Sequence, residues 1–166
     1  MTDVQELYKQ KVMTPEEALE QISDGDLIAI GCDALEPMTM LSNIHKIHDR
    51  INQVTLHFGA CTQDYEFLVN PEFRDKFKCT SRFFAKALRE NYKYGNVSLI
   101  PLHFHGCITR YGEVWHPDVV ITSGTRMDEH GYINLSLGGW EKYFLDHAKS
   151  VIIEVVDDMP DRKSVV

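Results

Sequence analysis

Positive charge is scarce in this sequence. Its 166 residues hold 17 Lys and Arg against 25 Asp and Glu, which gives a formal net charge of −8 at pH 7. A protein that binds nucleic acid without sequence preference needs a basic stripe to face the phosphates. The composition therefore excludes that class of partner, and an anionic ligand would have to be held by a few local donors.

Long apolar runs and paired cysteines are missing as well. No run approaches the ~20 apolar residues that cross a bilayer, so we expect no membrane partner. The N-terminus does not resemble a secretion signal, and no C-x-x-C pair occurs among Cys32, Cys61, Cys79 and Cys107. These absences predict a cytoplasmic protein in a reducing compartment.

The apolar residues that are present form short runs typical of a parallel sheet. Residues 118–122 and 151–156 are rich in β-branched side chains at consecutive positions, the pattern of strands that are covered on both faces. A helical segment is expected between them. Shortly after the first run, Gly131 can take a positive φ in a turn, and the alternation of residues 132–137 predicts a further strand.

The rest of the chain alternates between helix and strand. Thr14 and Glu17 form the capping box of a helix that should run to Ile22. The other expected elements are strands at 27–30, 54–58 and 96–102, a helix with its apolar face at Met38, Leu41, Ile44 and Ile47, and a mostly helical segment at 71–94. With 43% hydrophobic residues and few linker-like stretches, residues 1–166 are predicted to form a single α/β domain, an open, mainly parallel sheet with helices on both faces.

The loop that follows the first predicted strand is a candidate ligand site. In an open α/β sheet, ligands bind beyond the carboxyl ends of the strands, where a glycine lets the backbone approach and the next helix offers free N–H groups. Gly31 and Pro37 delimit such a loop. One glycine is far short of a dinucleotide fingerprint, so the spacing alone favours a plain strand-to-helix turn over a Rossmann cofactor site.

Histidines suggest a second candidate site. His103 and His105 lie on one face of an extended segment, and a metal site is conceivable if they are joined by His57, His116 and Cys107. A zinc site needs three or four convergent ligands, whereas the spacing supports only two. Polar residues at a strand end are therefore the favoured interpretation, and no metal is predicted.

Several segments resemble one protein family in their order and spacing. They are Ser123, residues 127–132 (MDEHGY), residues 148–155 (AKSVIIEV) and Met159-Pro160. Together they are similar to the acetyl-CoA hydrolase/transferase family, and within it to 4-hydroxybutyrate and butyrate CoA-transferases. The resemblance extends over nearly the whole chain and implies the N-terminal domain of a CoA-transferase.

The candidate loop takes part in this resemblance. The family has a loop of the form Gly, three residues, Gly-Glu-Pro, and the match leaves Leu35 in place of the second glycine. The resemblance implies that the loop borders the acyl-CoA site, that its N–H groups stabilise the oxyanion of an attacked thioester, and that Glu36 holds or polarises the substrate acid. The substrate-binding residues expected on this basis are Gly31, Glu36, Pro37, His105 and Ser123.

The resemblance also implies what this chain lacks. Enzymes of the family use a glutamate that attacks the acyl-CoA thioester and then carries CoA as a glutamyl thioester. That glutamate lies in the second half of a chain more than twice this length, so no catalytic residue is expected here. Coenzyme A is expected as a substrate, without a permanently bound cofactor. The expected partners are an acyl-CoA, a short carboxylic acid and a C-terminal half or second subunit, in an oligomer.

Three functions remain open at this point. The chain is expected to be half of a CoA-transferase that moves CoA between an acyl-CoA and a short-chain carboxylate, and to be inactive alone. If water takes the place of the acceptor acid, the reaction is hydrolysis of the acyl-CoA instead of transfer of CoA. A module without catalysis, which binds CoA esters or a partner through exposed apolar surface, is the alternative of another class.

Overall fold

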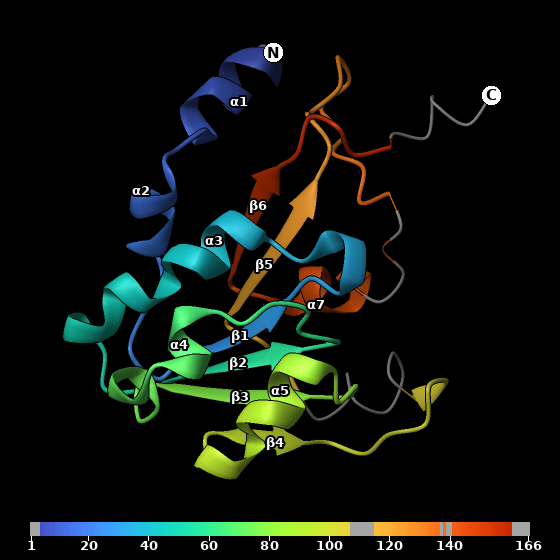
Figure 1. Cartoon of the computed structure of the whole chain (residues 1–166). Helices are drawn as coiled ribbons and strands as arrows, with labels where there is room; N and C mark the ends of the chain where they lie inside the picture. Colours follow the sequence, from blue (N-terminus) through green and yellow to red (C-terminus); the bar gives the residue numbers. More distant parts are fainter. Residues whose placement is uncertain (1–3, 107–114, 137, 139–140, 161–166) are drawn as a thin grey trace.

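A six-stranded sheet forms the centre of the molecule (Figure 1). The computed structural model describes residues 4–106, 115–136, 138 and 141–160. Within them every strand pairing is parallel, and the strand order is β4-β3-β2-β1-β5-β6. The strands are β1 (Leu27–Ile30), β2 (Val54–Phe58), β3 (Phe77–Ser81), β4 (Val97–Leu99), β5 (Val119–Gly124) and β6 (Ser150–Val155). The expected open sheet is confirmed and is entirely parallel.

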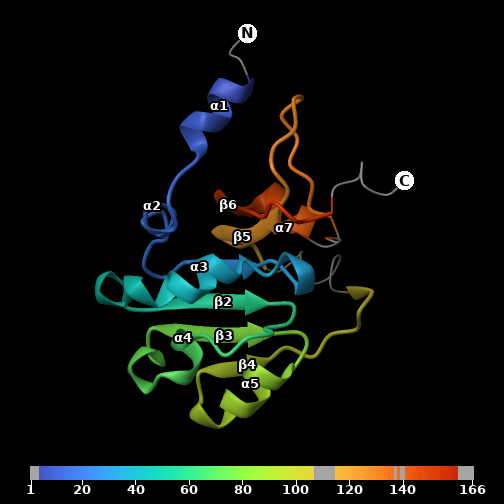
Figure 2. The same cartoon turned by 45° about the horizontal axis from the view of Figure 1, so that its top comes forward.

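Short helices connect the strands and lie on both faces of the sheet (Figures 1 and 2). The α-helices are α1 (Val4–Lys11), α2 (Pro15–Leu19), α3 (Met38–Asn43), α4 (Glu66–Val69), α5 (Lys86–Asn91) and α7 (Glu141–His147). The 3-10 helices are η1 (Asp33–Leu35), η2 (Ile44–Arg50), η3 (Pro71–Phe73) and η4 (Tyr92–Tyr94). The predicted capping box opens α2, because Thr14 Oγ1 accepts from the Glu17 N–H while the Glu17 carboxylate accepts from the Thr14 N–H.

Each face of the sheet has its own hydrophobic cluster, because successive side chains of a strand point to opposite faces. The larger cluster packs α2 to α5 against one face, with Ile28 and Ile121 among its strand residues. The smaller cluster joins Ala29 and Val120 to Phe144 of α7 on the other face. Strand β5, which lies between β1 and β6, is buried at all six positions, as predicted for a strand that is covered on both sides.

The prediction of a mostly helical segment at residues 71–94 is correct for η3, α5 and η4 but wrong for residues 77–81. The segment contains β3, whose residues alternate between buried and partly exposed positions, with Phe77, Cys79 and Ser81 on the buried side. This period of two is the strand pattern. Lys78 favours a helix and Thr80 favours a strand, so local propensity is divided and the pairing of β3 between β2 and β4 decides the structure.

The strand predicted at residues 132–137 is also wrong for its described part, residues 132–136, which form a loop. The loop returns to the end of β5, where the Thr125 N–H donates to the Asn134 carbonyl at 3.0 Å. β5 already pairs with β1 on one side and β6 on the other. The alternating residues therefore find no free edge of β5 to join.

None of the helices in the described ranges combines the length and the apolar character that crossing a bilayer requires.

Candidate functional site

A buried carboxylate joins two loops at the carboxyl end of the sheet. Glu36 follows β1 and is 5% exposed. Its oxygens accept hydrogen bonds from the Thr62 N–H at 3.1 Å, from Thr62 Oγ1 at 2.6 Å and from the Tyr65 hydroxyl at 2.8 Å. Thr62 and Tyr65 belong to the loop after β2. Glu36 therefore fastens the loop of β1 to the loop of β2 and lies within the protein, facing donors of the chain itself.

The start of this loop requires a glycine at position 31, because the neighbouring atoms leave no space for a side chain. A Cβ atom there would lie 2.3 Å from the Leu35 carbonyl oxygen and 2.5 Å from Thr122 Oγ1. The 3-10 turn η1 folds back over Gly31, and Leu35, in the place of the family's second glycine, is 1% exposed. The position that the family fills with a glycine therefore holds a buried apolar side chain in this protein.

Ser123 and Pro37 complete the buried part of the site. Ser123 is 1% exposed at the end of β5, and its hydroxyl donates to the Glu36 carbonyl at 3.3 Å. Pro37 is buried directly before α3. The structure thus brings together Gly31, Glu36, Pro37 and Ser123, four of the five residues expected at the substrate site.

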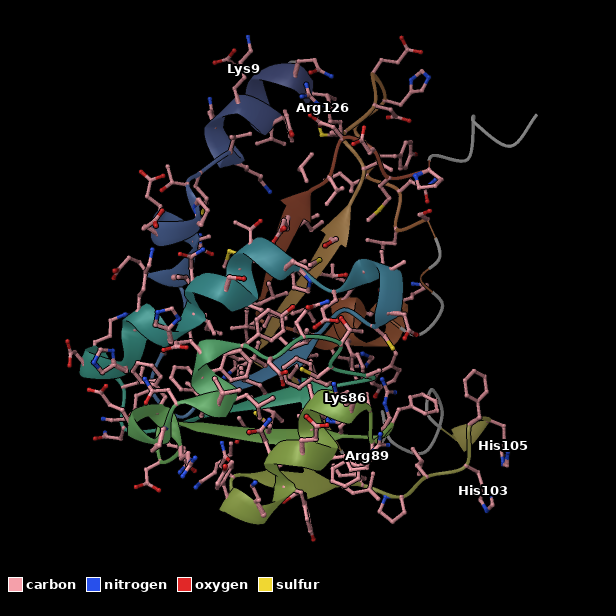
Figure 3. All side chains as sticks on the ribbon, in the orientation of Figure 1. Lys9, Lys86, Arg89, His103, His105 and Arg126 are labelled. Carbon is pink, nitrogen blue, oxygen red and sulfur yellow. The ribbon has the colours of Figure 1, made fainter. Side chains whose placement is uncertain are left out.

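His105 is separate from this group. It lies on the exposed loop after β4, which is divided from β1 by β3 and β2 in the sheet. Figure 3 shows His103 and His105 at the outer end of that loop, away from β1. Their rings are stacked with centroids 5.6 Å apart, so the two imidazoles lie on one side as expected, but distant from Glu36.

Backbone N–H groups around the loop are mostly engaged. The Gly31 N–H donates to the Ile121 carbonyl at 2.8 Å, and the Glu36 N–H donates to the Asp33 carbonyl at 3.1 Å. The first free amides of α3, at Thr39 and Met40, donate to the Glu154 carboxylate of β6 at 3.0 and 2.9 Å. Glu154 thus occupies the helix N-terminus that the sequence analysis considered as part of a ligand site.

The tip of the loop, at Asp33 and Ala34, differs from its ends in backbone conformation and in hydrogen bonding. Asp33 has a φ of 53°, a backbone conformation that costs an ordinary residue about 1 kcal/mol or more and that recurs at ligand sites. Asp33 and Ala34 are exposed, and their amides donate to no described residue. These two N–H groups are therefore the donors that the loop can offer to a ligand.

Arg82 lies beside this loop and was not among the residues that the sequence analysis named. It follows β3 directly, is 9% exposed, and its guanidinium carbon lies 5.9 Å from the centre of the Phe144 ring. Its Nη2 lies 3.4 Å from the place of a Cβ atom at Gly59, beside Cys32. The carboxyl end of a parallel strand is where open α/β sheets bind their ligands. Arg82 was missed because β3 was not predicted.

Two titratable neighbours of Arg82 are held in their neutral forms. Burial, and then the Arg82 charge, lowers the pKa of His57 to about 3. Burial, and then the Asp33 side chain, raises the pKa of the Cys32 thiol to about 12. Cys32 is therefore a poor nucleophile, and His57 is a poor general base.

The metal site considered from the sequence is not assembled in the described part of the chain. His57 is buried beside Trp115, with ring centroids 4.5 Å apart, and its Nδ1 lies 2.8 Å from Thr80 Oγ1. Within the same residues no group of three His, Cys, Asp or Glu side chains is placed to hold a metal ion. Cys107, the proposed sulfur ligand, lies outside the described residues.

Comparison with known sequences identifies the family. The profile of the acetyl-CoA hydrolase/transferase N-terminal domain matches residues 1–165. The succinyl-CoA:cyclohexane-1-carboxylate CoA transferase of Geobacter metallireducens is 26% identical over 156 residues, which cover 92% of this chain and 35% of the relative. The butyryl-CoA:acetate CoA-transferase of Anaerostipes caccae is 24% identical over 157 residues, covering 93% of this chain and 35% of the relative. The chain thus spans about a third of the length of these relatives.

Solved structures give the same result for the fold. RipA from Yersinia pestis aligns with a TM-score of 0.86 and 26% identity, over 96% of this chain and 39% of that protein. The 4-hydroxybutyrate CoA-transferase from Porphyromonas gingivalis has the same fold, with a TM-score of 0.72 and 21% identity over 94% of this chain and 36% of that protein. The chain belongs to the acetyl-CoA hydrolase/transferase family, whose N-terminal domain it matches over nearly its whole length.

Proposed function

We propose that this chain is the N-terminal half of a CoA-transferase that moves CoA between an acyl-CoA and a short-chain carboxylate. The nucleophilic glutamate lies outside these residues, in the part of the fold that the relatives carry beyond the matched region. Its carboxylate attacks the thioester and expels CoA thiolate, and CoA thiolate then converts the acyl-glutamyl anhydride into a glutamyl-CoA thioester and the free acid. The acceptor acid repeats these steps in reverse. The reducing cytoplasm is the proposed compartment, because no C-x-x-C pair occurs among the four cysteines.

The observation that carries the proposal is the engagement of Glu36. Its carboxylate is 5% exposed and accepts hydrogen bonds from Thr62 and Tyr65. A carboxylate that is buried and bonded to donors on both oxygens is a weak nucleophile, because attack would break those bonds. Glu36 therefore supports the walls of the site, and the reacting glutamate comes from elsewhere.

The described residues have a defined task in this reaction. The amides of Asp33 and Ala34 lie at the exposed tip of the β1 loop and stabilise the oxyanion formed when the thioester carbonyl is attacked. The Arg82 guanidinium offers a positive charge to the carboxylate of the acid substrate. Glu36 and Ser123 hold the loop on which these donors depend. CoA itself is a substrate in this proposal and leaves after each cycle.

An acyl-exchange assay tests the proposal. Butyryl-CoA and acetate are incubated with the isolated chain, and separately with the tagged protein isolated from its native host together with whatever completes it. Acetyl-CoA is followed by mass spectrometry. Exchange by the native preparation and none by the isolated chain is the expected result. Exchange by the isolated chain would contradict the assignment of Glu36, and release of free CoA without acetyl-CoA would make the enzyme a hydrolase.

A pair of arginine variants tests the role of Arg82 in the native preparation. Arg82→Gln should raise the KM for acetate about tenfold or more, because the loss of a charged hydrogen bond is of that size. Arg126→Gln is the matched control, since Arg126 is exposed in the loop after β5, at the top of the view in Figure 3, and pairs with the exposed Asp157. Equal effects of the two substitutions would remove Arg82 from the substrate site.

A further inference from the structure

Strand β6 has a free edge in the described part of the molecule. It is the last strand in the sheet order and pairs only with β5. The Ser150 N–H donates at 3.1 Å to the carbonyl of Asp118, directly before β5, and the Val156 N–H donates at 2.9 Å to the Gly124 carbonyl of β5. In a parallel pair such donors alternate along the strand. The N–H and C=O groups of Val151, Ile153 and Val155 therefore point away from β5, in the plane of the sheet.

This edge opens onto a groove. The groove has a volume of about 870 Å³ and runs between β6 and the N-terminal segment of the chain. Residues 151–155 form one wall, and α1 with the residues up to Pro15 forms the opposite wall. Met127, Gly131 and Ile133 of the loop after β5 close one end. The loop and α1 are in contact there, because Gln5 Nε2 donates to the Asp128 carbonyl at 3.3 Å.

The walls of the groove include several exposed apolar side chains. Helix α1 buries none of its residues, and its Val4 and Leu7 are 36% and 45% exposed. Met13 is 41% exposed on the same wall, and Val151 and Val155 of β6 are 41% and 38% exposed. Soluble proteins rarely leave such side chains together without a partner, and rarely leave a flat apolar edge strand unprotected.

We propose that the groove receives an extended apolar strand that pairs with the free edge of β6 and becomes the seventh strand of the sheet. The strand comes from the polypeptide that completes the CoA-transferase fold beyond the region matched here, so the inference rests on the proposed function. A strand that pairs with all six residues of β6 is about 20 Å long. Its main chain bonds to Val151, Ile153 and Val155, and its side chains contact Leu7 and Met13 on the wall of α1.

Two observations favour this occupant. The relatives are about three times as long as the match, so each of them carries a large further part that could supply a strand to this domain. The lining offers unpaired main-chain groups in a row beside aliphatic side chains, which suit a strand, whereas a small ligand is oriented by a few convergent polar groups. A second copy of this chain that paired through its own β6 would also have to fit its own α1 into the same groove. A second copy is therefore the less favoured occupant.

Hydrogen exchange tests the pairing directly. The exchange of the amides of Val151, Ile153 and Val155 is compared between the isolated chain and the tagged protein from its native host. We expect exchange to slow at least a hundredfold at these three amides in the native preparation. A photo-crosslinker at position 151 should couple to a segment outside residues 1–166. Unchanged exchange, or a crosslink to β6 of a second copy, would overturn the proposal.

A matched pair of substitutions separates pairing from packing. Val151→Pro removes an N–H group that points out of the sheet and leaves the bonds to β5 intact, as proline does on edge strands. Val151→Thr keeps the N–H group and the β-branched shape. The proline variant should bind the completing polypeptide at least tenfold more weakly than the threonine variant while its isolated chain keeps its melting temperature. Equal binding by both variants would contradict strand pairing.

The acyl-exchange assay on the same native preparation distinguishes the two proposals. Protected amides without acyl exchange would leave the seventh strand in place and refute the transferase. Acyl exchange with unprotected amides would refute the seventh strand and leave the transferase in place. A native protein that carries no further polypeptide and shows no exchange would refute both.

Discussion

The Glu36 carboxylate shows how a single buried charge can hold two loops together. It is stable in the interior because Thr62 and Tyr65 replace the water that it loses on burial. Burial, and then the adjacent Glu36 charge, raises the pKa of the Tyr65 hydroxyl far above its ordinary value. Tyr65 therefore stays protonated at every working pH and remains a donor to Glu36.

We predict that Glu36→Ala lowers the free energy of unfolding by about 2–4 kcal/mol, because the buried donors of Thr62 and Tyr65 lose their charged acceptor. Glu36→Gln should lower it less, since the amide oxygen still accepts one bond. Urea unfolding measures both. Glu129→Ala, at an exposed position, is the control and should change the free energy by less than about 0.5 kcal/mol. A loss as small for Glu36→Ala as for the control would show that these bonds do not hold the loops.

His57 makes a second prediction at the residue scale. It is 1% exposed, and burial lowers its pKa from 6.5 to about 3 in the folded protein. The unfolded chain therefore binds a proton that the folded chain rejects, so the free energy of unfolding falls as the pH drops from about 6.5 towards 3.

The expected slope from His57 is at most about 1.4 kcal/mol per pH unit. His57→Gln should reduce the loss of stability over this pH range, as followed by urea unfolding at several pH values. His130→Gln is the matched control, because His130 is exposed in the loop after β5. If both variants kept the slope of the parent chain, another group would be responsible for the acid sensitivity.

Glu154 connects two elements that are far apart in the sequence. It lies on β6 and accepts hydrogen bonds from the first amides of α3, at Thr39 and Met40. A carboxylate at a helix N-terminus is favourable because it meets free N–H groups and the positive end of the helix dipole. The bond also anchors the strand whose outer edge forms the groove.

We predict that Glu154→Ala speeds hydrogen exchange at Thr39 and Met40 about tenfold and lowers the free energy of unfolding by about 1–2 kcal/mol. The change should be smaller for Glu154→Gln, which keeps an acceptor without the charge. Glu90→Ala on α5 is the control, since its exposed ion pair with Lys86 contributes little. Faster exchange across the whole of α3 to α5 would indicate general loosening instead of a lost helix cap.

At the scale of the whole molecule, the two hydrophobic clusters share strands. Ile28 and Ile121 belong to the large cluster, while their chain neighbours Ala29 and Val120 belong to the cluster around α7. Loss of one cluster exposes the strands that support the other. The described domain should therefore unfold as one unit.

The corresponding prediction is that urea unfolding curves from far-UV circular dichroism and from tryptophan fluorescence coincide. Trp115 contributes to the fluorescence from the smaller cluster, where its ring lies 5.5 Å from that of Phe144. Phe144→Leu should shift both midpoints to lower urea by the same amount. A fluorescence transition that precedes the circular dichroism transition would mean that the α7 layer unfolds by itself.

Elements that are decided by residues close together in the sequence could be predicted, whereas elements that are decided by distant residues could not. Period and composition predicted β1, β2, β5 and β6 because their apolar runs are local and strong. β3 was missed, since its mixed side chains become a strand only between β2 and β4. Arg82 was missed with it, because its place in the site depends on the end of β3.

The sequence by itself determined the family, the α/β class and the loop from Gly31 to Pro37, because these depend on residue order and on the nearest neighbours along the chain. Only the tertiary structure decided what the loop does. It placed the Glu36 carboxylate among Thr62 and Tyr65 and set His105 apart from the loop. It also placed the Glu154 carboxylate where it accepts hydrogen bonds from the first amides of α3. Because those contacts join segments that are distant in the chain, the spacing of residues in the sequence does not predict them.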